Sequence, residues 1–415
     1  MKLFFLLVEA FILIWMPISI LRKKDLSIVY MPLFSFSYGV IDSALPTGFF
    51  LLLLGCLVAY YVFYNLPFVF KNPFSIMLVI YFCILALDIQ DFRSERKSFI
   101  TVISLFLLIG VVAEVYKKYP RDVIFKELAL SSFLILSIFV FNALFSTAFR
   151  FNPGAMYGIS TGVLFGNIVF AAFNFLPLVC YVALQKAVNE RNKWYFLIYA
   201  ISVFLTLLTL RRSVMLLTLI GTLFVMIPLM DLKNIKRFFG IFLGLSLATL
   251  IVVSTTGFLE MIQERYELRQ LEDRNLEEEG RVQEIGMVYR DLFVYFDYSP
   301  WFGYGLFDAS GNYGKGFYGN RNLHTDLTVL IHGSGFLGLF LYLGMVGTVF
   351  WLVWKKTKTK NDAIQFVFIC LVFTTYFITG RYNSITTTLL VYLILCLPIA
   401  NKISEIPNNP TLVTE

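Results

Sequence analysis

Four side chains in this sequence could do chemistry: a pair of arginines between two apolar runs, a third arginine within a polar segment, and a histidine where that segment ends. Arg211 and Arg212 stand between two apolar runs in TLRRSVM, and Arg281 follows an acidic run and a glycine. His324 lies where a polar segment ends and a long apolar run begins. A guanidinium binds phosphate oxygens through two parallel hydrogen bonds, and an imidazole can accept a proton at neutral pH. These residue types are therefore candidates for a phosphate or pyrophosphate site and for a general base.

Each candidate also has a purely structural explanation. Arg211 and Arg212 could reach lipid headgroups and fix the topology, Arg281 could be a surface charge, and His324 could cap a helix or lie in the membrane interface. A second histidine, His332, lies two turns further on in HGSGFLGL. Its small neighbours are typical of close helix packing, so we expect a structural role for it.

The chain between Arg281 and His324 carries the turn-rich string SPWFGYG, Ser299 to Gly305. The aromatic residues in and around this segment could stack on sugar rings, or they could form a belt at the membrane interface. They are Tyr295, Tyr298, Trp301, Tyr304, Tyr313 and Tyr318. We predict that Arg211, Trp301, Tyr304 and Asp326 contribute to substrate binding.

The elements that must position these residues are helices in a membrane. Of the 415 residues, 58% are hydrophobic and 15% are charged, and the mean hydropathy is +0.76. A soluble protein carries about 25% charged residues. A span needs about 20 apolar residues, so the sequence predicts an all-α polytopic membrane protein with about 12–13 transmembrane helices and one large external loop. The segment Ser27–Ala44 is the weakest of these spans.

Four regions follow from this pattern. Residues 1–257 form transmembrane helices that include the Arg211–Arg212 pair, and residues 258–323 form the large external loop with short helices. Residues 324–400 form the last transmembrane helices, and residues 401–415 form a cytoplasmic tail. Within the loop, charge spacing predicts a helix over Glu260–Glu279, and Val282–Phe296 is predicted to form a second, amphipathic helix.

The distribution of lysine and arginine predicts the orientation of the spans. The basic string Lys355–Lys360 should be cytoplasmic, and counting back places Lys117–Lys126 and Gln185–Lys193 on the same side. The large loop and the Arg211–Arg212 pair then lie outside, as does the amino terminus if all thirteen spans are real. The net charge of +7 fits anionic lipid as a partner better than nucleic acid.

Several functional classes lack their signatures here. The sequence has no GxxxxGK[ST] loop, no HExxH, no GxSxG and no DxD string. The five cysteines lie in apolar runs without a CxxC, which favours core or lipid-facing positions over metal ligands or disulfides. No metal site is predicted, and a glycosyl donor, if there is one, should be a membrane lipid.

Taken in order, these elements resemble the O-antigen polymerase (Wzy) and O-antigen ligase (WaaL) superfamily of bacterial membrane proteins. The matching motifs are Arg211–Ser213, Arg281, SPWFGYG, His324 and Gly335–Leu339, and the resemblance covers about Gly154 to Trp354. The chain departs from the family pattern at two places. Arginine precedes the serine, which leaves open whether Arg211 or Arg212 is the equivalent residue, and Thr325 stands where asparagine usually follows the histidine.

The resemblance implies a GT-C-like, metal-independent glycosyltransferase without a cofactor, in the bacterial inner membrane with its active site on the periplasmic side. Its donor would be an undecaprenyl-diphosphate-linked oligosaccharide. Arg212 and Arg281 would bind the diphosphate, and His324 would take the proton from the acceptor hydroxyl. His324, Arg281 and Arg212 are thus the predicted catalytic residues.

Three functions are compatible with these motifs. The first is a polymerase that joins repeat units of an O-antigen, capsule or exopolysaccharide, with an acceptor glycan, membrane lipids and a chain-length regulator as partners. The second is a ligase that transfers the glycan to lipid A-core. The third, from another class, is a flippase for lipid-linked polysaccharide, although transporters usually show two related halves and none are evident here. A purely structural membrane protein stays a fourth possibility.

Overall fold

The computed structural model describes residues 2–40, 44–89, 91–149, 170–208, 211–229, 280–307, 311–317, 319, 322–380 and 382–401, with isolated positions between 240 and 260. Regular structure in these residues is helical, as predicted. The α-helices are α1 (Lys2–Lys23), α2 (Met31–Val40), α3 (Thr47–Tyr64), α4 (Phe68–Lys71), α5 (Pro73–Leu85), α6 (Phe92–Tyr116), α7 (Arg121–Ala148), α8 (Leu176–Glu190), α9 (Lys193–Leu208), α10 (Arg212–Met226), α13 (Gly280–Arg290), α14 (Asp326–Lys356), α15 (Lys360–Thr379) and α16 (Ile385–Leu395). Short 3₁₀ turns are η1 (Lys24–Tyr30), η2 (Ala86–Asp88), η3 (Phe170–Phe175), η4 (Ile227–Leu229), η7 (Gly314–Gly316) and η8 (Leu397–Ile399), and η6 (Asp291–Tyr295) is a π-helical turn.

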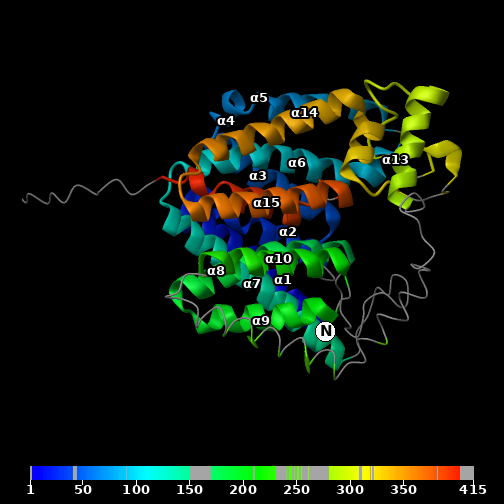
Figure 1. Ribbon diagram of the computed structural model, residues 1–415. Helices are drawn as coiled ribbons and strands as arrows, with labels where there is room; N and C mark the ends of the chain where they lie inside the picture. The colour runs from blue at the N-terminus through cyan, green and yellow to red at the C-terminus, as the bar shows by residue number, and fades with distance from the viewer. Residues whose placement is uncertain are drawn as a thin grey trace, which may run out of the picture.

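The long helices lie side by side in one bundle, and α13 stands beyond one end of it (Figure 1). Six helices are long and apolar enough to cross a membrane, and four shorter apolar helices accompany them in the described residues. Their outer faces carry large exposed apolar side chains, such as Leu52 at 61% and Phe340 at 63% exposure. Apolar surface of this kind suits lipid rather than water, so the chain is an all-α, multi-pass membrane protein.

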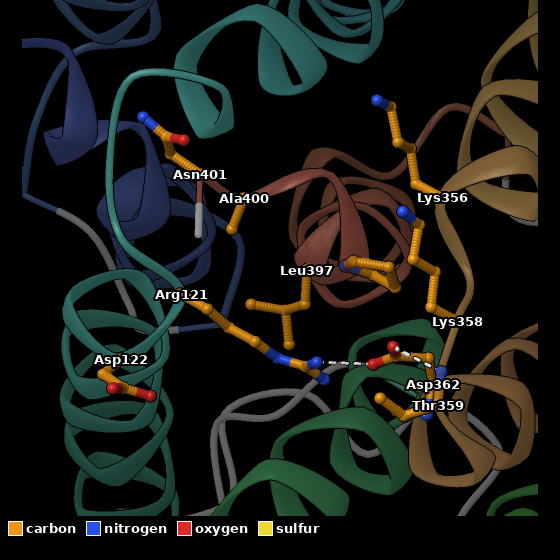
Figure 2. Close-up of a pocket in the computed structure, with 10 residues that line it drawn as sticks. Arg121, Asp122, Lys356, Lys358, Thr359, Asp362, Leu397, Ala400 and Asn401 are labelled. Carbon is orange, nitrogen blue, oxygen red and sulfur yellow. Dashed lines mark hydrogen bonds and ion pairs between the residues drawn. The ribbon is translucent and has the colours of Figure 1, made fainter. Parts of the chain in front are cut away.

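One end of the bundle, here called the basic end, gathers lysines and arginines from segments far apart in sequence. Arg121 at the start of α7 forms an ion pair with Asp362 at the start of α15 (Figure 2). Arg121 and Asp362 line a pocket of 260 Å³, and Lys356 and Lys358 line it too. Lys118 adds an ion pair of 2.7 Å with Asp25. The predicted cytoplasmic segments 117–126 and 355–360 therefore lie at the same end.

The opposite end, here called the loop end, carries α13 and His324. Helix α14 has 31 residues, which gives a length of about 46 Å at 1.5 Å per residue. It starts next to His324 and ends at Lys356 in the basic end. The two ends are thus separated by the thickness of a membrane.

The path of α8, α9 and α10 places the arginine pair at the loop end. Lys186, near the end of α8, lies over the ring of Phe125 in the first turns of α7, so α8 ends at the basic end. Helix α9 starts there, and Tyr199 in α9 is hydrogen-bonded to Thr222 in α10 at 2.6 Å. Since α9 runs from the basic end and ends at Leu208, Arg212 begins α10 at the loop end.

The amino-terminal part of the bundle differs from a simple row of spans. The weak span predicted over Ser27–Ala44 is formed by η1 and α2, and the residues from 25 to 34 are all buried. Lys23 is paired with Glu127 at 2.6 Å, so α1 ends at the basic end. The predicted helix over Glu260–Glu279 and the tail after Asn401 lie outside the described residues, apart from Glu260 itself.

Candidate active site

Helix α13 and the turn η6 confirm the amphipathic helix predicted over Val282–Phe296. Glu284, Val288 and Leu292 recur at helical spacing and are buried at 0%, 3% and 2% exposure. Val288 and Leu292 pack against Tyr313 and Leu323 in a small core outside the main bundle. This core fixes α13 against the chain that leads into α14.

Glu284 uses its whole carboxylate to hold His324. Its Oε2 accepts the backbone N–H of His324 at 3.0 Å, and its Oε1 lies 2.8 Å from the Nδ1 atom of the imidazole. The carboxylate is fully buried, whereas 46% of the imidazole surface is exposed. A buried carboxylate needs such partners, because burying it without hydrogen bonds would cost several kcal/mol.

Two further elements fix the backbone around His324. Thr325 caps α14, because its side chain accepts the N–H of Thr328 at 3.0 Å. Asp326 is buried and accepts the backbone N–H of Tyr382 at 3.1 Å. Gly380, at the end of α15, has a φ of +73°, and a side chain there would overlap the carbonyl of His324. The histidine is therefore held between α13, α14 and the end of α15.

This arrangement determines what the imidazole can do. An ionised carboxylate can only accept hydrogen bonds, so Glu284 favours the tautomer with the proton on Nδ1. The other nitrogen, Nε2, then carries a lone pair and is available to take a proton. A carboxylate in this position also stabilises the imidazolium that forms. The pair has the geometry of an oriented general base.

Arg281 lies one turn before Glu284 on the same helix. At 3.6 residues per turn, positions three apart are separated by roughly 60° around the axis and their Cβ atoms by about 5–6 Å. Arg281 is half-buried at the start of α13, next to the face that holds His324. Arg281 is thus on the helix that holds His324, and its role in binding a diphosphate stays a prediction.

The SPWFGYG string packs its backbone into a break in α14. Gly335 interrupts the helix with φ +64° and ψ −171°. The freed backbone N–H of Phe336 donates to the carbonyl of Pro300 at 2.8 Å, and that of Leu337 donates to Trp301 at 3.2 Å. A side chain on Gly335 would overlap the Trp301 carbonyl. The two sequence motifs therefore form one structural unit, in which each supplies what the other leaves unsatisfied.

His332 belongs to this unit and has the structural role expected for it. It is 1% exposed, its Nε2 atom lies 3.0 Å from the carbonyl of Asn312, and its own carbonyl accepts the N–H of Tyr304 at 2.6 Å. The rings of Tyr298 and Tyr304 pack on it at centroid distances of 5.0 and 5.3 Å. Burial raises the pKa of Tyr298 above its ordinary value.

The other predicted site residues also lie at the loop end, but they differ from His324 in their exposure and in the helices that carry them. Arg211 is half-buried in extended conformation before α10, and Arg212 is the exposed first residue of that helix. Helices α10 and α14 both pack against α15. Trp301 and Tyr304 are 66% and 43% exposed. Whether these residues bind substrate stays a prediction, as does the role of Asp326.

Glu284 is the residue that sequence reasoning missed. Its sequence signal is the spacing of three from Arg281, but the loop holds many glutamates, and nothing in the sequence distinguishes this one from the others. Within the described part of the chain, no three His, Cys, Asp or Glu side chains gather as metal ligands would. Metal independence stays a prediction.

Residues 197–352 match a family model described as O-antigen ligase. This match supports membership of the O-antigen polymerase and ligase superfamily. It starts within α9, contains α10, α13 and the motif unit, and ends within α14, so it includes all the predicted site residues. The superfamily consists of glycosyltransferase-like enzymes. No curated protein sequence matches the chain.

Proposed function

We propose that this protein is a polysaccharide polymerase of the O-antigen, capsule or exopolysaccharide type. It transfers a glycan from an undecaprenyl-diphosphate donor to a sugar hydroxyl of another lipid-linked unit, without a metal ion. The observation that carries the proposal is the oriented pair of His324 and Glu284, at 2.8 Å, in which Glu284 lies one turn from Arg281 on α13.

The reaction is a displacement at the anomeric carbon of the donor. Nε2 of His324 takes the proton from the acceptor hydroxyl, and the oxygen attacks the anomeric carbon as the bond from this carbon to the phosphate oxygen breaks. Undecaprenyl diphosphate leaves with the bonding electron pair. The ionised Glu284 stabilises the imidazolium during this step.

Positive charge at the loop end stabilises the departing diphosphate. Arg212 and Arg281 can bind its oxygens in a bidentate manner, which a lysine cannot do. The amino-terminal ends of α10 and α14 also lie at this end, and their helix dipoles favour an anion. Because diphosphate is a good leaving group, these charges suffice for catalysis in this proposal.

The proposed location is the bacterial inner membrane, with the loop end on the periplasmic side. The clustered lysines and arginines of the basic end support this orientation, since cytoplasmic loops carry an excess of these residues. In this orientation the lipid tail of the donor stays in the bilayer while its diphosphate lies at the loop end, near His324. A chain-length regulator is a further proposed partner.

A gel of reaction products tests the proposal. Purified protein receives the undecaprenyl-diphosphate oligosaccharide with and without lipid A-core, beside the variants His324→Ala and Asn322→Ala. A ladder from donor alone that only His324→Ala abolishes establishes the polymerase. A single shifted band that requires lipid A-core shows a ligase instead. No product with either acceptor refutes both and favours the flippase.

A further inference from the structure

A second face of α13 lines a pocket that the catalytic pair does not use. The pocket has a volume of 460 Å³, which lies in the range of about 300–1,000 Å³ typical of small-molecule sites. Gln283, Met287 and Arg290 line it from α13, and Lys315 and Phe317 line it from the facing turn. It is lined by neither His324 nor Glu284.

The facing turn is fixed firmly against α13. The backbone N–H of Gly314 donates to Oδ2 of Asp291 at 2.7 Å. Gly314 has a φ of +57°, and a side chain there would meet the sulfur of Met287 at 2.6 Å. Lys315 lies over the ring of Tyr295 at 3.8 Å. The pocket is therefore a built feature of the loop and is bounded by a turn of defined conformation.

Asp291 places a buried hydrogen-bond acceptor, unsatisfied among the described residues, at the pocket. It lines the pocket, yet its side chain is 1% exposed. Its Oδ1 atom is buried and has no hydrogen-bond partner in the part of the chain that the structure describes. Burial raises the pKa of this carboxyl, against the opposing effect of the hydrogen bond from Gly314. A buried acceptor without a donor is costly, and a ligand hydroxyl would satisfy it.

The other lining residues complete a set suited to a sugar ring. Phe317 is 72% exposed, so its ring offers an apolar face against which a pyranose could pack. Arg290 is exposed and can donate several hydrogen bonds to hydroxyl and ring oxygens. Carboxylate, guanidinium and aromatic ring together match a molecule that is polar at its rim and apolar on its faces.

The pocket lies on a face of α13 that adjoins the catalytic one. At 3.6 residues per turn, Gln283 and Arg290 point roughly 100–120° away from Glu284 around the helix axis. Arg290 lies about 9 Å further along that axis, at 1.5 Å per residue. A glycan chain of a few sugars can therefore reach from the pocket to His324.

We propose that this pocket binds a saccharide unit of the acceptor glycan, with Asp291 accepting a sugar hydroxyl, Arg290 donating to sugar oxygens and Phe317 packing on the ring. The identity of the ligand rests on the proposed function. The site would hold the acceptor strand while its terminal hydroxyl lies at His324.

The test is direct binding of a soluble probe. The probe is the repeat-unit oligosaccharide of the source strain, two units long and released from its lipid by mild acid. Its Kd is measured by isothermal titration calorimetry for the full-length protein and for Arg290→Gln, Phe317→Ala and Tyr289→Ala. Tyr289 is an exposed aromatic residue on the far side of α13 and serves as the matched control.

We expect Arg290→Gln and Phe317→Ala each to raise the Kd at least about tenfold, and Tyr289→Ala to change it less than about threefold. Unchanged affinity in both pocket variants, or no binding to the unaltered protein, would overturn the proposal. His324→Ala separates the two proposals, since it should bind the probe normally but form no product. If that variant keeps full activity while the pocket variants lose binding, the catalytic assignment is wrong and the pocket assignment stands.

Discussion

The substitution Glu284→Gln tests the catalytic pair most sharply, because it keeps the shape of the side chain and removes only its charge. The amide has one acceptor and one donor group, whereas the carboxylate uses two acceptors toward His324. If the amide oxygen keeps the backbone N–H of His324, the amide NH₂ must face Nδ1. The imidazole then carries its proton on Nε2, where it cannot accept one from a hydroxyl.

Two effects determine how far kcat is expected to fall in Glu284→Gln. A hydrogen bond to a charged group contributes about 1.5–3 kcal/mol. At 1.36 kcal/mol per factor of ten, its loss lowers the rate roughly 10- to 150-fold. The wrong tautomer adds to this, and in serine proteases the comparable change costs about 10⁴ in kcat. Because the imidazole of His324 is 46% exposed, water screens part of the interaction. We therefore expect kcat to fall roughly 10²- to 10³-fold.

The assay is the rate of ladder formation with purified protein at several donor concentrations. The KM for the donor should stay within about threefold of its original value, because Glu284 acts through His324 and not on the diphosphate. Glu284→Asp should regain part of the activity. Glu190→Gln, an exposed carboxylate at the basic end, is the matched control and should be fully active. A Glu284→Gln protein that is folded and retains more than about a third of the kcat would refute the reasoning.

Three further predictions concern the motif unit, the arginines and the basic end. Gly335→Ala should lower stability by at least about 1–3 kcal/mol, because its backbone conformation suits only glycine and the new side chain would overlap Trp301. In the same helix, Gly347→Ala has open space and should be neutral or slightly stabilising, and thermal unfolding in detergent compares the two. Arg212→Lys and Arg281→Lys should each lower kcat/KM for the donor about tenfold or more in the ladder assay, and full activity in both would show that bidentate binding is not needed. Asp362→Asn should lower stability by about 1 kcal/mol, since the amide loses the ion pair with Arg121 and its single oxygen cannot accept from both Arg121 and the Thr359 backbone, while kcat should stay unchanged.

The sequence by itself determined the class of the protein and the order of its functional motifs. Long apolar runs leave the helix as the backbone conformation that satisfies its own hydrogen bonds in lipid, so an all-α membrane protein followed from composition. The helical spacing in Val282–Phe296 likewise predicted α13, because this periodicity is a local property. His324 was a candidate because it stands at the border of an apolar run, and Arg281 because of the resemblance to the O-antigen polymerase and ligase superfamily.

The tertiary structure decided which of these groups meet. Glu284 and His324 are 40 residues apart, and the packing of Val288 and Leu292 on Leu323 helps to bring the carboxylate to the imidazole. The tertiary structure likewise brings the SPWFGYG string to Gly335. In the sequence their glycines are typical of turns, but in the structure they allow the two backbones to come into contact. Such contacts depend on which buried faces pack together when the segments that carry them are far apart in the sequence. Local spacing carries no information about that choice, which is made by the burial of apolar surface and the pairing of buried polar groups.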